Sequence, residues 1–305
     1  MTKPTKEILE KHNAFYKPDS DFSAIGRLRQ SQWRERKEYP AGKLGNYLTA
    51  DFAKKSKANY LTDKIKTLVQ YEVYKSSLEG KLISEPRIWD NLLSSQPLCF
   101  NLFGELHFDL KLATKYFKKL FPTRVNKITA IKFEHSPGRG NADYTGDHSA
   151  FDVFVEYVNE TGKKGFIGIE VKYAENLKED KEKTEATFQK HKEQYLKFAT
   201  KSKLFPASSI DKLKQTPLQQ IWRDHLLSIA TLKDYDEGFF VFLFPSQNKE
   251  CQIAVDNYIQ QLNTSKEEKN GFYSRHLDEF ITTLKQLHKA DWTTELEERY
   301  LGINL

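Results

Sequence analysis

The sequence has few of the features that mark secreted, membrane-spanning or zinc-held proteins. Only two cysteines occur in 305 residues, and they form no CxxC pair. Neither a disulfide framework nor a cysteine-bound zinc site is therefore predicted. No apolar run approaches the roughly 18 residues that a membrane-spanning helix needs. The first residues, MTKPTKEILEKHNAF, lack the apolar segment of a secretory signal. We therefore expect a protein of the reducing cytoplasm, with no membrane partner.

Charge is unevenly distributed along the chain. The net charge is +6, with 38% hydrophobic and 30% charged residues, which is typical of a folded globular protein. The whole positive excess lies in residues 1–60, which hold 9 Lys and 4 Arg against 7 acidic residues. This segment could meet a polyanion or could be a solvated helical arm. Trp33, among its arginines, is the best candidate for stacking on a base from outside the core.

Hydrophobic periodicity predicts helices on either side of a group of strands. Helices are expected at 60–80, 106–120 and 175–203, from Thr216-Pro217 with Thr216 as N-cap, and from about 253 to the end. Strands rich in Ile, Val and Phe are expected at 128–134, 150–158, 164–173 and 237–245. The core order is helix, three-strand meander, helix, strand, which predicts a mixed α/β fold.

The second and third predicted strands form a hairpin that carries a candidate active site. Because side chains alternate along a strand, Glu170 and Lys172 project to the same side. If the NETG turn is centred near Thr161, Asp152 lies directly opposite Glu170. Opposed side chains have Cβ atoms about 5 Å apart, so two carboxylates there repel unless one is protonated or a cation lies between them.

The cation alternative makes chemical sense. Carboxylate oxygens suit Mg²⁺ or Mn²⁺, and Lys172 could orient or deprotonate an attacking water or stabilise charge on a phosphate. The tripeptide E-x-K is unspecific, since it occurs five times, but only the copy at Glu170 lies in an apolar strand. Only that copy has an aspartate at the mirrored position. The alternative is a solvated hairpin face with ordinary charge pairs.

These residues resemble the PD-(D/E)xK nuclease superfamily, whose core has the order αβββαβ. Asp152 stands in SAFDVFVEY, and Glu170-Val171-Lys172 stands in GFIGIEVKY. The segments SSQPLCFNLFGEL, FEHSPGR and QQIWRDHLL also resemble bacterial proteins of restriction endonuclease type. The proline of the superfamily's name is replaced here by Phe151.

The resemblance implies a restriction-endonuclease-like core with a central mixed sheet flanked by helices, within residues 96–250. Residues 1–95 would form a basic, mainly helical extension, and residues 251–305 would form C-terminal helices packed on the core. It further implies that Asp152 and Glu170 ligate the metal with the main-chain carbonyl of Val171, and that Lys172 serves catalysis.

Several other residues are candidates for the same site. Many superfamily members use an additional acid, and either Glu134, at the end of the first strand, or Glu105, in the preceding helix, could supply it. Gln220 and Arg223 share a helix face, and Arg223 could hold a phosphate by a forked contact or pair with a nearby acid.

Four further polar residues lie near these segments in the sequence. We interpret His148, Asp147 and His225 as incidental rather than as ligands. Glu175 could serve either the site or the structure.

The sequence therefore predicts a Mg²⁺-dependent endonuclease acting on DNA, in restriction or defence, with Mn²⁺ able to substitute. A homodimer is possible, since many nucleases of this fold dimerise. The alternative is a non-catalytic nucleic-acid-binding or scaffold protein that keeps the fold. A nuclease for RNA or branched DNA is a third option.

Overall fold

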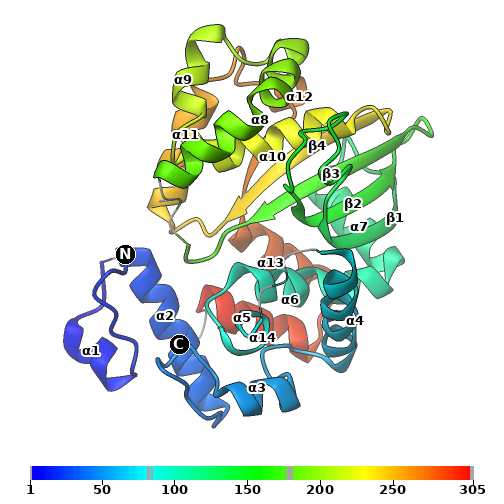
Figure 1. Cartoon of the computed structure of the whole chain (residues 1–305). Coiled ribbons are helices and arrows are strands. Elements are labelled where there is room, and N and C mark those ends of the chain that lie inside the picture. The colour runs from blue at the N-terminus through cyan, green and yellow to red at the C-terminus, as the bar shows by residue number, and fades with distance from the viewer. Residues whose placement is uncertain (1, 81–82, 84, 176, 178–180, 303–305) are drawn as a thin grey trace.

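A five-stranded sheet lies at the centre of the computed structural model, which describes residues 2–80, 83, 85–175, 177 and 181–302. Helices cover both faces of the sheet, so the predicted mixed α/β fold is confirmed (Figure 1). The strands are β1 (Lys127–His135), β2 (Phe151–Val158), β3 (Lys164–Val171), β4 (Glu237–Phe244) and β5 (Phe272–His276).

Fourteen helices are present in the described residues. They are α1 (Lys6–Lys11), α2 (Asp21–Arg36), α3 (Ala50–Ser56), α4 (Asp63–Glu79), α5 (Arg87–Asp90), α6 (Ser95–Phe108), α7 (Leu110–Leu120), α8 (Lys181–Ser202), α9 (Ile210–Leu213), α10 (Leu218–Thr231), α11 (Lys249–Ile259), α12 (Glu267–Asn270), α13 (Leu277–Leu287) and α14 (Asp291–Leu301). None of them has the length and apolar composition needed to cross a membrane.

The strands are arranged in the order β1-β2-β3-β4-β5. The first three form an antiparallel meander, and β4 and β5 add parallel to β3. The hairpin register is the one predicted from its turn: Val153 pairs with Ile169, and Phe154 pairs with Gly168. The expectation of helices alone after residue 253 was wrong, because β5 extends the sheet. At five residues, β5 is too short for alternation to distinguish it from a helix end.

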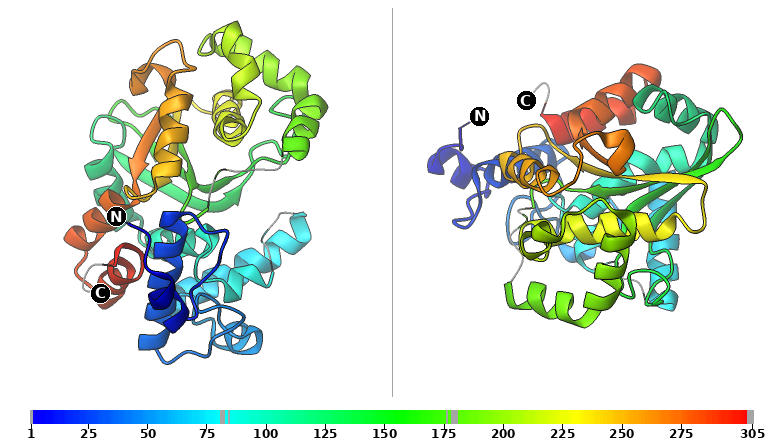
Figure 2. Two further views of the ribbon diagram at one scale, coloured as in Figure 1. Left: turned by 90° about the vertical axis from the view of Figure 1, so that its left-hand side faces the viewer. Right: turned by 90° about the horizontal axis from the view of Figure 1, so that it is seen from above.

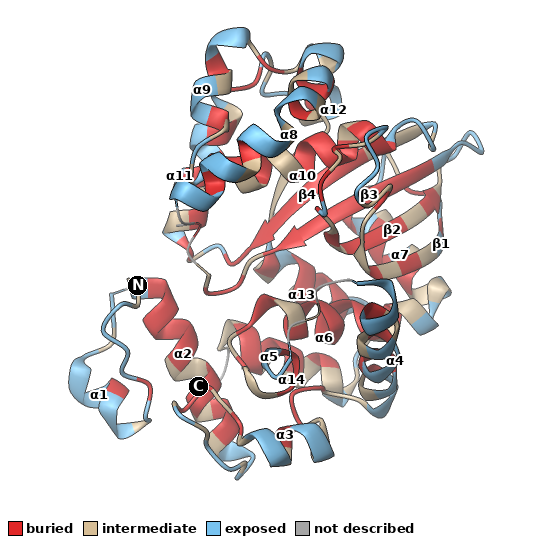
Figure 3. Cartoon of the chain, viewed as in Figure 1, coloured by how far each residue is buried: buried red, intermediate tan, exposed pale blue. Residues whose placement is uncertain are grey.

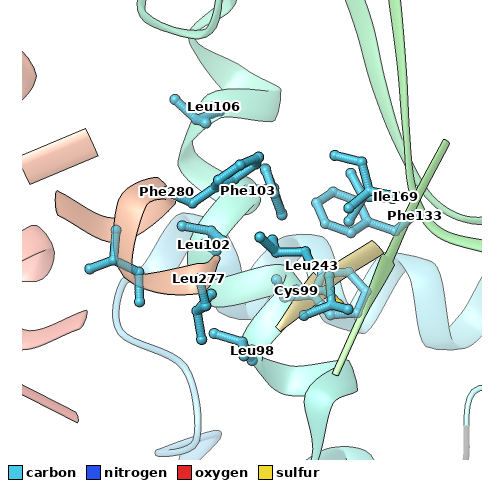
Figure 4. Packing of buried hydrophobic residues seen from close by; sticks show 14 of the residues in the cluster. Leu98, Cys99, Leu102, Phe103, Leu106, Phe133, Ile169, Leu243, Leu277 and Phe280 are labelled. Atoms are coloured by element: carbon cyan, nitrogen blue, oxygen red, sulfur yellow. The ribbon is translucent and has the colours of Figure 1, made fainter. Parts of the chain in front are cut away.

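Alternation along the strands divides the core into two layers. Val153, Val155 and Ile167 belong to one buried cluster, whereas Phe154 and Phe166 belong to the other. The first layer packs against α6, α7 and α13, as Figure 4 shows for the side chains around Leu102 and Phe103. The second layer is rich in phenylalanine and is covered by α8, α10 and α11 (Figure 1).

The N-terminal and C-terminal helices pack together below the sheet. Figure 2 shows α2 and α14 side by side, and the two helices are in contact. Arg299 of α14 is fully buried; it donates to Gln30 Oε1 at 2.9 Å and to Asn59 Oδ1 at 2.6 Å. Its guanidinium also lies 4.3 Å from the centre of the Trp33 ring. The prediction that Trp33 stacks on a base was therefore wrong, because this side chain is buried in the contact between the two helices.

Two helix predictions also needed correction. The segment 106–120 is not a single helix, because α6 ends at Phe108 and the Asp109 carboxylate caps the start of α7. Thr216 does not cap α10, because its hydroxyl donates instead to the carbonyl of Leu177 at 2.9 Å. Figure 3 shows that α8 exposes most of its surface, as its polar sequence predicts. Of the five E-x-K copies, the one that starts at Glu179 lies outside the described residues, as does Lys81 of the copy that starts at Glu79.

Candidate functional site

A polar cleft of about 200 Å³ opens where β1 ends, β2 begins and β3 ends, and residues of α10 also line it. Four acidic residues line it together with several basic and neutral polar side chains. The lining residues are Glu134, Arg139, His148, Ser149, Ala150, Asp152, Glu170, Gln220, Arg223 and Asp224. Residues from the hairpin and from the helix 50 positions later thus meet in one place, as the sequence predicted for Asp152, Glu170, Gln220 and Arg223.

Asp152, Glu170 and Lys172 are linked by short contacts. Lys172 Nζ lies 2.8 Å from Glu170 Oε1, and both side chains are largely buried. The backbone N–H of Val171 donates to Asp152 Oδ2 at 2.7 Å. A strand residue directs its N–H and C=O to the same side, so the carbonyl of Val171 also points towards Asp152. The ladder between β2 and β3 ends at the Val153–Ile169 pair, one step before Asp152 and Glu170.

The cleft concentrates negative charge in a region with little solvent. Burial raises the pKa of Asp152, and the carboxylates of Glu170 and Glu134 raise this pKa further. Burial alone would lower the pKa of Lys172, but Glu170 and Asp152 outweigh it, so the pKa is raised and the ammonium stays charged. The ionised form of Asp152 is therefore disfavoured unless a positive charge beyond the single lysine offsets its neighbours.

The structure distinguishes the two candidates for an additional acid. Glu134 lines the cleft, accepts a hydrogen bond from Gln96 of α6 and has a positive φ of 46°. Such strained positions tend to be retained at functional sites. Glu105 lies away from the cleft, where Thr62 donates to it at 2.6 Å and Lys64 lies 3.5 Å away. It binds the start of α4 rather than facing the hairpin.

Helix α10 brings three polar side chains to the cleft. Gln220 donates to Glu170 Oε1 at 2.7 Å. Arg223 donates to Ser149 Oγ at 3.0 Å, and its Nε lies 3.5 Å from Asp147 Oδ2. Arg223 therefore forms the ion pair with a nearby acid that was one of its two predicted roles, and it also lines the cleft. Asp224, which sequence reasoning missed, also lines the cleft and is only 3% exposed. Its position four residues after Gln220 was the available signal.

Asp147 holds the loop between β1 and β2 in place. Its carboxylate accepts hydrogen bonds from the hydroxyls of Thr145 and Ser149 at 2.7 Å each and from Tyr195 of α8 at 2.6 Å. Burial would raise the pKa of Asp147, but Arg223 and these hydroxyls outweigh it, so the pKa is lowered. Asp147 therefore orients Arg223 and connects the loop with two helices.

Two further basic side chains border the cleft. Arg139, in the FEHSPGR segment, donates to the carbonyls of His148 at 3.1 Å and of Gly80 at 2.8 Å. Both acceptors are neutral, and no carboxylate among the described residues forms an ion pair with Arg139. His148 is exposed beside it. Sequence reasoning missed Arg139 because nothing in the segment itself shows that the loop returns towards the hairpin.

The remaining candidates are structural. His225 is buried between the hydroxyl of Tyr258 and the carbonyl of Asn270, and burial lowers its pKa to about 4. Glu175 accepts hydrogen bonds from the backbone N–H of Ser95, at the start of α6, and from that of Tyr173. Glu175 therefore fixes the chain after β3 against α6.

The donor set fits a divalent cation with many water ligands. Asp152 Oδ1 and Glu170 Oε2 receive no hydrogen bond from any described residue, while the other oxygen of each carboxylate is held in place. Within the described chain, no three His, Cys, Asp or Glu side chains form a ready-made metal cage. Two carboxylates and a carbonyl, completed by waters, are a typical set for Mg²⁺.

Comparison with known proteins gives one match. A family model for the PD-(D/E)XK nuclease superfamily matches residues 17–302, nearly the whole chain. No curated protein and no solved structure matches the chain. The five-stranded mixed sheet with flanking helices agrees with the fold of that superfamily.

Proposed function

The chain belongs to the PD-(D/E)XK nuclease superfamily, and on that basis we propose that it hydrolyses phosphodiester bonds of DNA in the cleft beneath α10. Membership in the superfamily indicates a metal-dependent nuclease. We further propose Mg²⁺ as the natural ion, with Mn²⁺ as a substitute.

One observation carries the proposal. Asp152, Glu170 and Lys172 meet at the end of the hairpin, and each carboxylate has one oxygen fixed while the other accepts no hydrogen bond from any described residue. An ordinary surface hairpin would leave such charges exposed, whereas Glu170 is only 6% exposed. Burial of like charges is expensive unless a cation offsets it.

The roles of the residues follow from their contacts. A divalent cation bound here would withdraw charge from the phosphate and favour ionisation of a water. Asp152, Glu170 and the carbonyl of Val171 would hold it. Gln220 and Lys172 fix Glu170 Oε1, so they orient this ligand. Because its salt bridge to Glu170 keeps Lys172 charged, the ammonium acts by positioning the water and stabilising the negative charge that develops on the phosphate.

Substrate phosphates would meet Arg139 and Arg223 at the border of the cleft. A guanidinium presents paired donors that match phosphate oxygens. The excess charge of residues 1–60 contributes less than its sequence position suggests, because Arg27 and Arg34 are buried. Arg27 is held by Asp19, and Arg34 donates to the carbonyls of Gly45 and Tyr39.

A DNA substrate and a role in restriction or defence are the finer parts of the proposal. Their support is the resemblance of the SSQPLCFNLFGEL, FEHSPGR and QQIWRDHLL segments to bacterial proteins of restriction endonuclease type. Gln96, Glu134, Arg139, Gln220 and Arg223 of these segments all lie at the cleft. Light scattering of the purified protein tests the homodimer that such enzymes often form.

A cleavage assay tests the proposed function. Purified protein is incubated with supercoiled plasmid, linear duplex, single-stranded DNA and RNA, with Mg²⁺ or with EDTA. We expect DNA cleavage that requires the cation and is lost in Lys172→Ala. The control is Lys164→Ala, which changes an exposed lysine at the far end of β3. Cleavage that persists in EDTA or in Lys172→Ala would refute the mechanism, and cleavage of RNA alone would refute the choice of substrate.

A further inference from the structure

Asp224 is a buried acid that the proposed mechanism does not use. It lies on α10, one helical turn after Gln220, and it lines the cleft with Asp152 and Glu170. Its side chain is only 3% exposed, and Asp224 Oδ2 has no hydrogen-bond partner in the described chain. A buried carboxylate oxygen without a partner costs free energy, so its presence calls for an explanation.

The other acids of the cleft show what is missing at Asp224. Glu170 is bound by Lys172 and Gln220, and Asp152 by the N–H of Val171. Glu134 accepts a hydrogen bond from Gln96. Asp224 has no comparable donor, and Arg223, its neighbour in sequence, directs one guanidinium N–H to Ser149. No described residue donates a hydrogen bond to the carboxylate of Asp224, and the cleft is the space that this residue lines.

We propose that Asp224 binds the hydration shell of the divalent cation, accepting hydrogen bonds from water molecules that the cation holds. The inference rests on the proposed function, since it assumes a cation between Asp152 and Glu170. Mg²⁺ usually keeps several waters and takes only one or two carboxylates directly. The cation's waters point their hydrogens outward, so they supply the donors that the protein does not. Asp224 is thus a positioning residue that orients the bound waters from the helix side.

The proposed role predicts opposite effects of one substitution on thermal stability without and with the cation, which a purely structural role would not produce. Without a cation, Asp224 destabilises the fold because its buried carboxylate lacks a donor for Oδ2. Asp224→Asn removes the carboxylate and keeps the shape, so it should raise the unfolding temperature of the cation-free protein. With a cation, the same substitution removes an acceptor, so the cation should stabilise the variant less than the wild type.

Titration calorimetry with Mn²⁺ and thermal unfolding with and without Mn²⁺ test the inference together. We expect Asp224→Asn to bind Mn²⁺ about 10–100-fold more weakly. This is the usual effect of losing a residue that hydrogen-bonds to a ligand of the metal ion. Asp90→Asn is the matched control, because Asp90 Oδ1 is also buried without a partner but lies outside the cleft. Asp90→Asn should leave Mn²⁺ affinity unchanged. If Asp224→Asn does not fold, Asp224→Ser gives the same readout.

The outcomes separate this inference from the proposed function. Asp152→Asn, measured in parallel, should lose Mn²⁺ binding if the proposed site is correct. If Asp152→Asn loses binding while Asp224→Asn keeps wild-type affinity, the role of Asp224 is refuted and the proposed site stands. A lower unfolding temperature for Asp224→Asn in the absence of cation would also refute it. No Mn²⁺ binding by the wild type would overturn both.

Discussion

Asp147 should be among the most important residues for stability near the cleft. Asp147→Ala would leave the hydroxyls of Thr145, Ser149 and Tyr195 without their acceptor and Arg223 without its acid. Breaking a buried ion pair from one side costs about 3–5 kcal/mol, and an unsatisfied buried donor costs about 1–3 kcal/mol. Because hydroxyls can rotate to other acceptors, we expect a total loss of about 3–5 kcal/mol. Asp147→Asn keeps one acceptor oxygen and should cost less.

Urea unfolding followed by tryptophan fluorescence measures this loss. Asp143→Ala is the control, because it changes an exposed acid of the same loop, and it should alter the free energy of unfolding by no more than about 0.5 kcal/mol. A loss of less than about 1 kcal/mol for Asp147→Ala would refute the account, since that is the worth of one ordinary hydrogen bond. It would mean that the loop rearranges around the missing acid.

Asp147 should also make the stability of the folded protein depend on pH. The pKa of Asp147 is lowered in the folded protein, so its ionised form contributes stability above the unfolded pKa of about 3.9. That contribution disappears as the pH falls through the folded pKa. The stability difference between wild type and Asp147→Asn should therefore be full at pH 7 and shrink below about pH 4. A difference that grows on acidification would contradict the lowered pKa.

Other substitutions test the borders of the site. Glu134→Gln should reduce cleavage with little change in stability, whereas Glu105→Ala should leave cleavage intact and cost about 0.5–1.5 kcal/mol, because Thr62 loses its acceptor. If the Glu105 variant lost cleavage and the Glu134 variant kept it, Glu105 and not Glu134 would be the additional acid of the site. Arg139→Ala should weaken nucleic-acid binding, measured by fluorescence anisotropy, and lower the slope of log affinity against log salt by about 1. An unchanged slope would exclude a phosphate contact by Arg139.

Much of the fold follows from local patterns in the sequence. The strands at 150–158 and 164–173 and their turn were predictable because alternation and turn residues act over a few positions. The register then brought Asp152 to Glu170 without knowledge of any distant residue. The strand β5 was not predictable, because its five residues pair only with β4 and carry no periodic signal of their own.

The parts of the site that sequence reasoning missed depend on distant contacts. Asp224 differs from any other helix aspartate only because α10 lies over the cleft. Arg139 reaches the cleft only because its loop folds back to Gly80. Trp33 looked exposed because arginines surround it in sequence, but its neighbour in space is Arg299. Arginines close to Trp33 in sequence do not show that its ring is exposed, because the residue that covers the ring can be distant in sequence. Here that residue, Arg299, lies 266 positions away.

The central claim is that the end of the hairpin holds the divalent cation. Anomalous diffraction from crystals of the protein grown with Mn²⁺ and a short DNA duplex locates the ion directly. We predict an anomalous peak between the carboxylates of Asp152 and Glu170, beside the carbonyl of Val171, with a phosphate of the duplex next to it. An ion bound elsewhere, or a duplex that binds away from this cleft, would contradict the account.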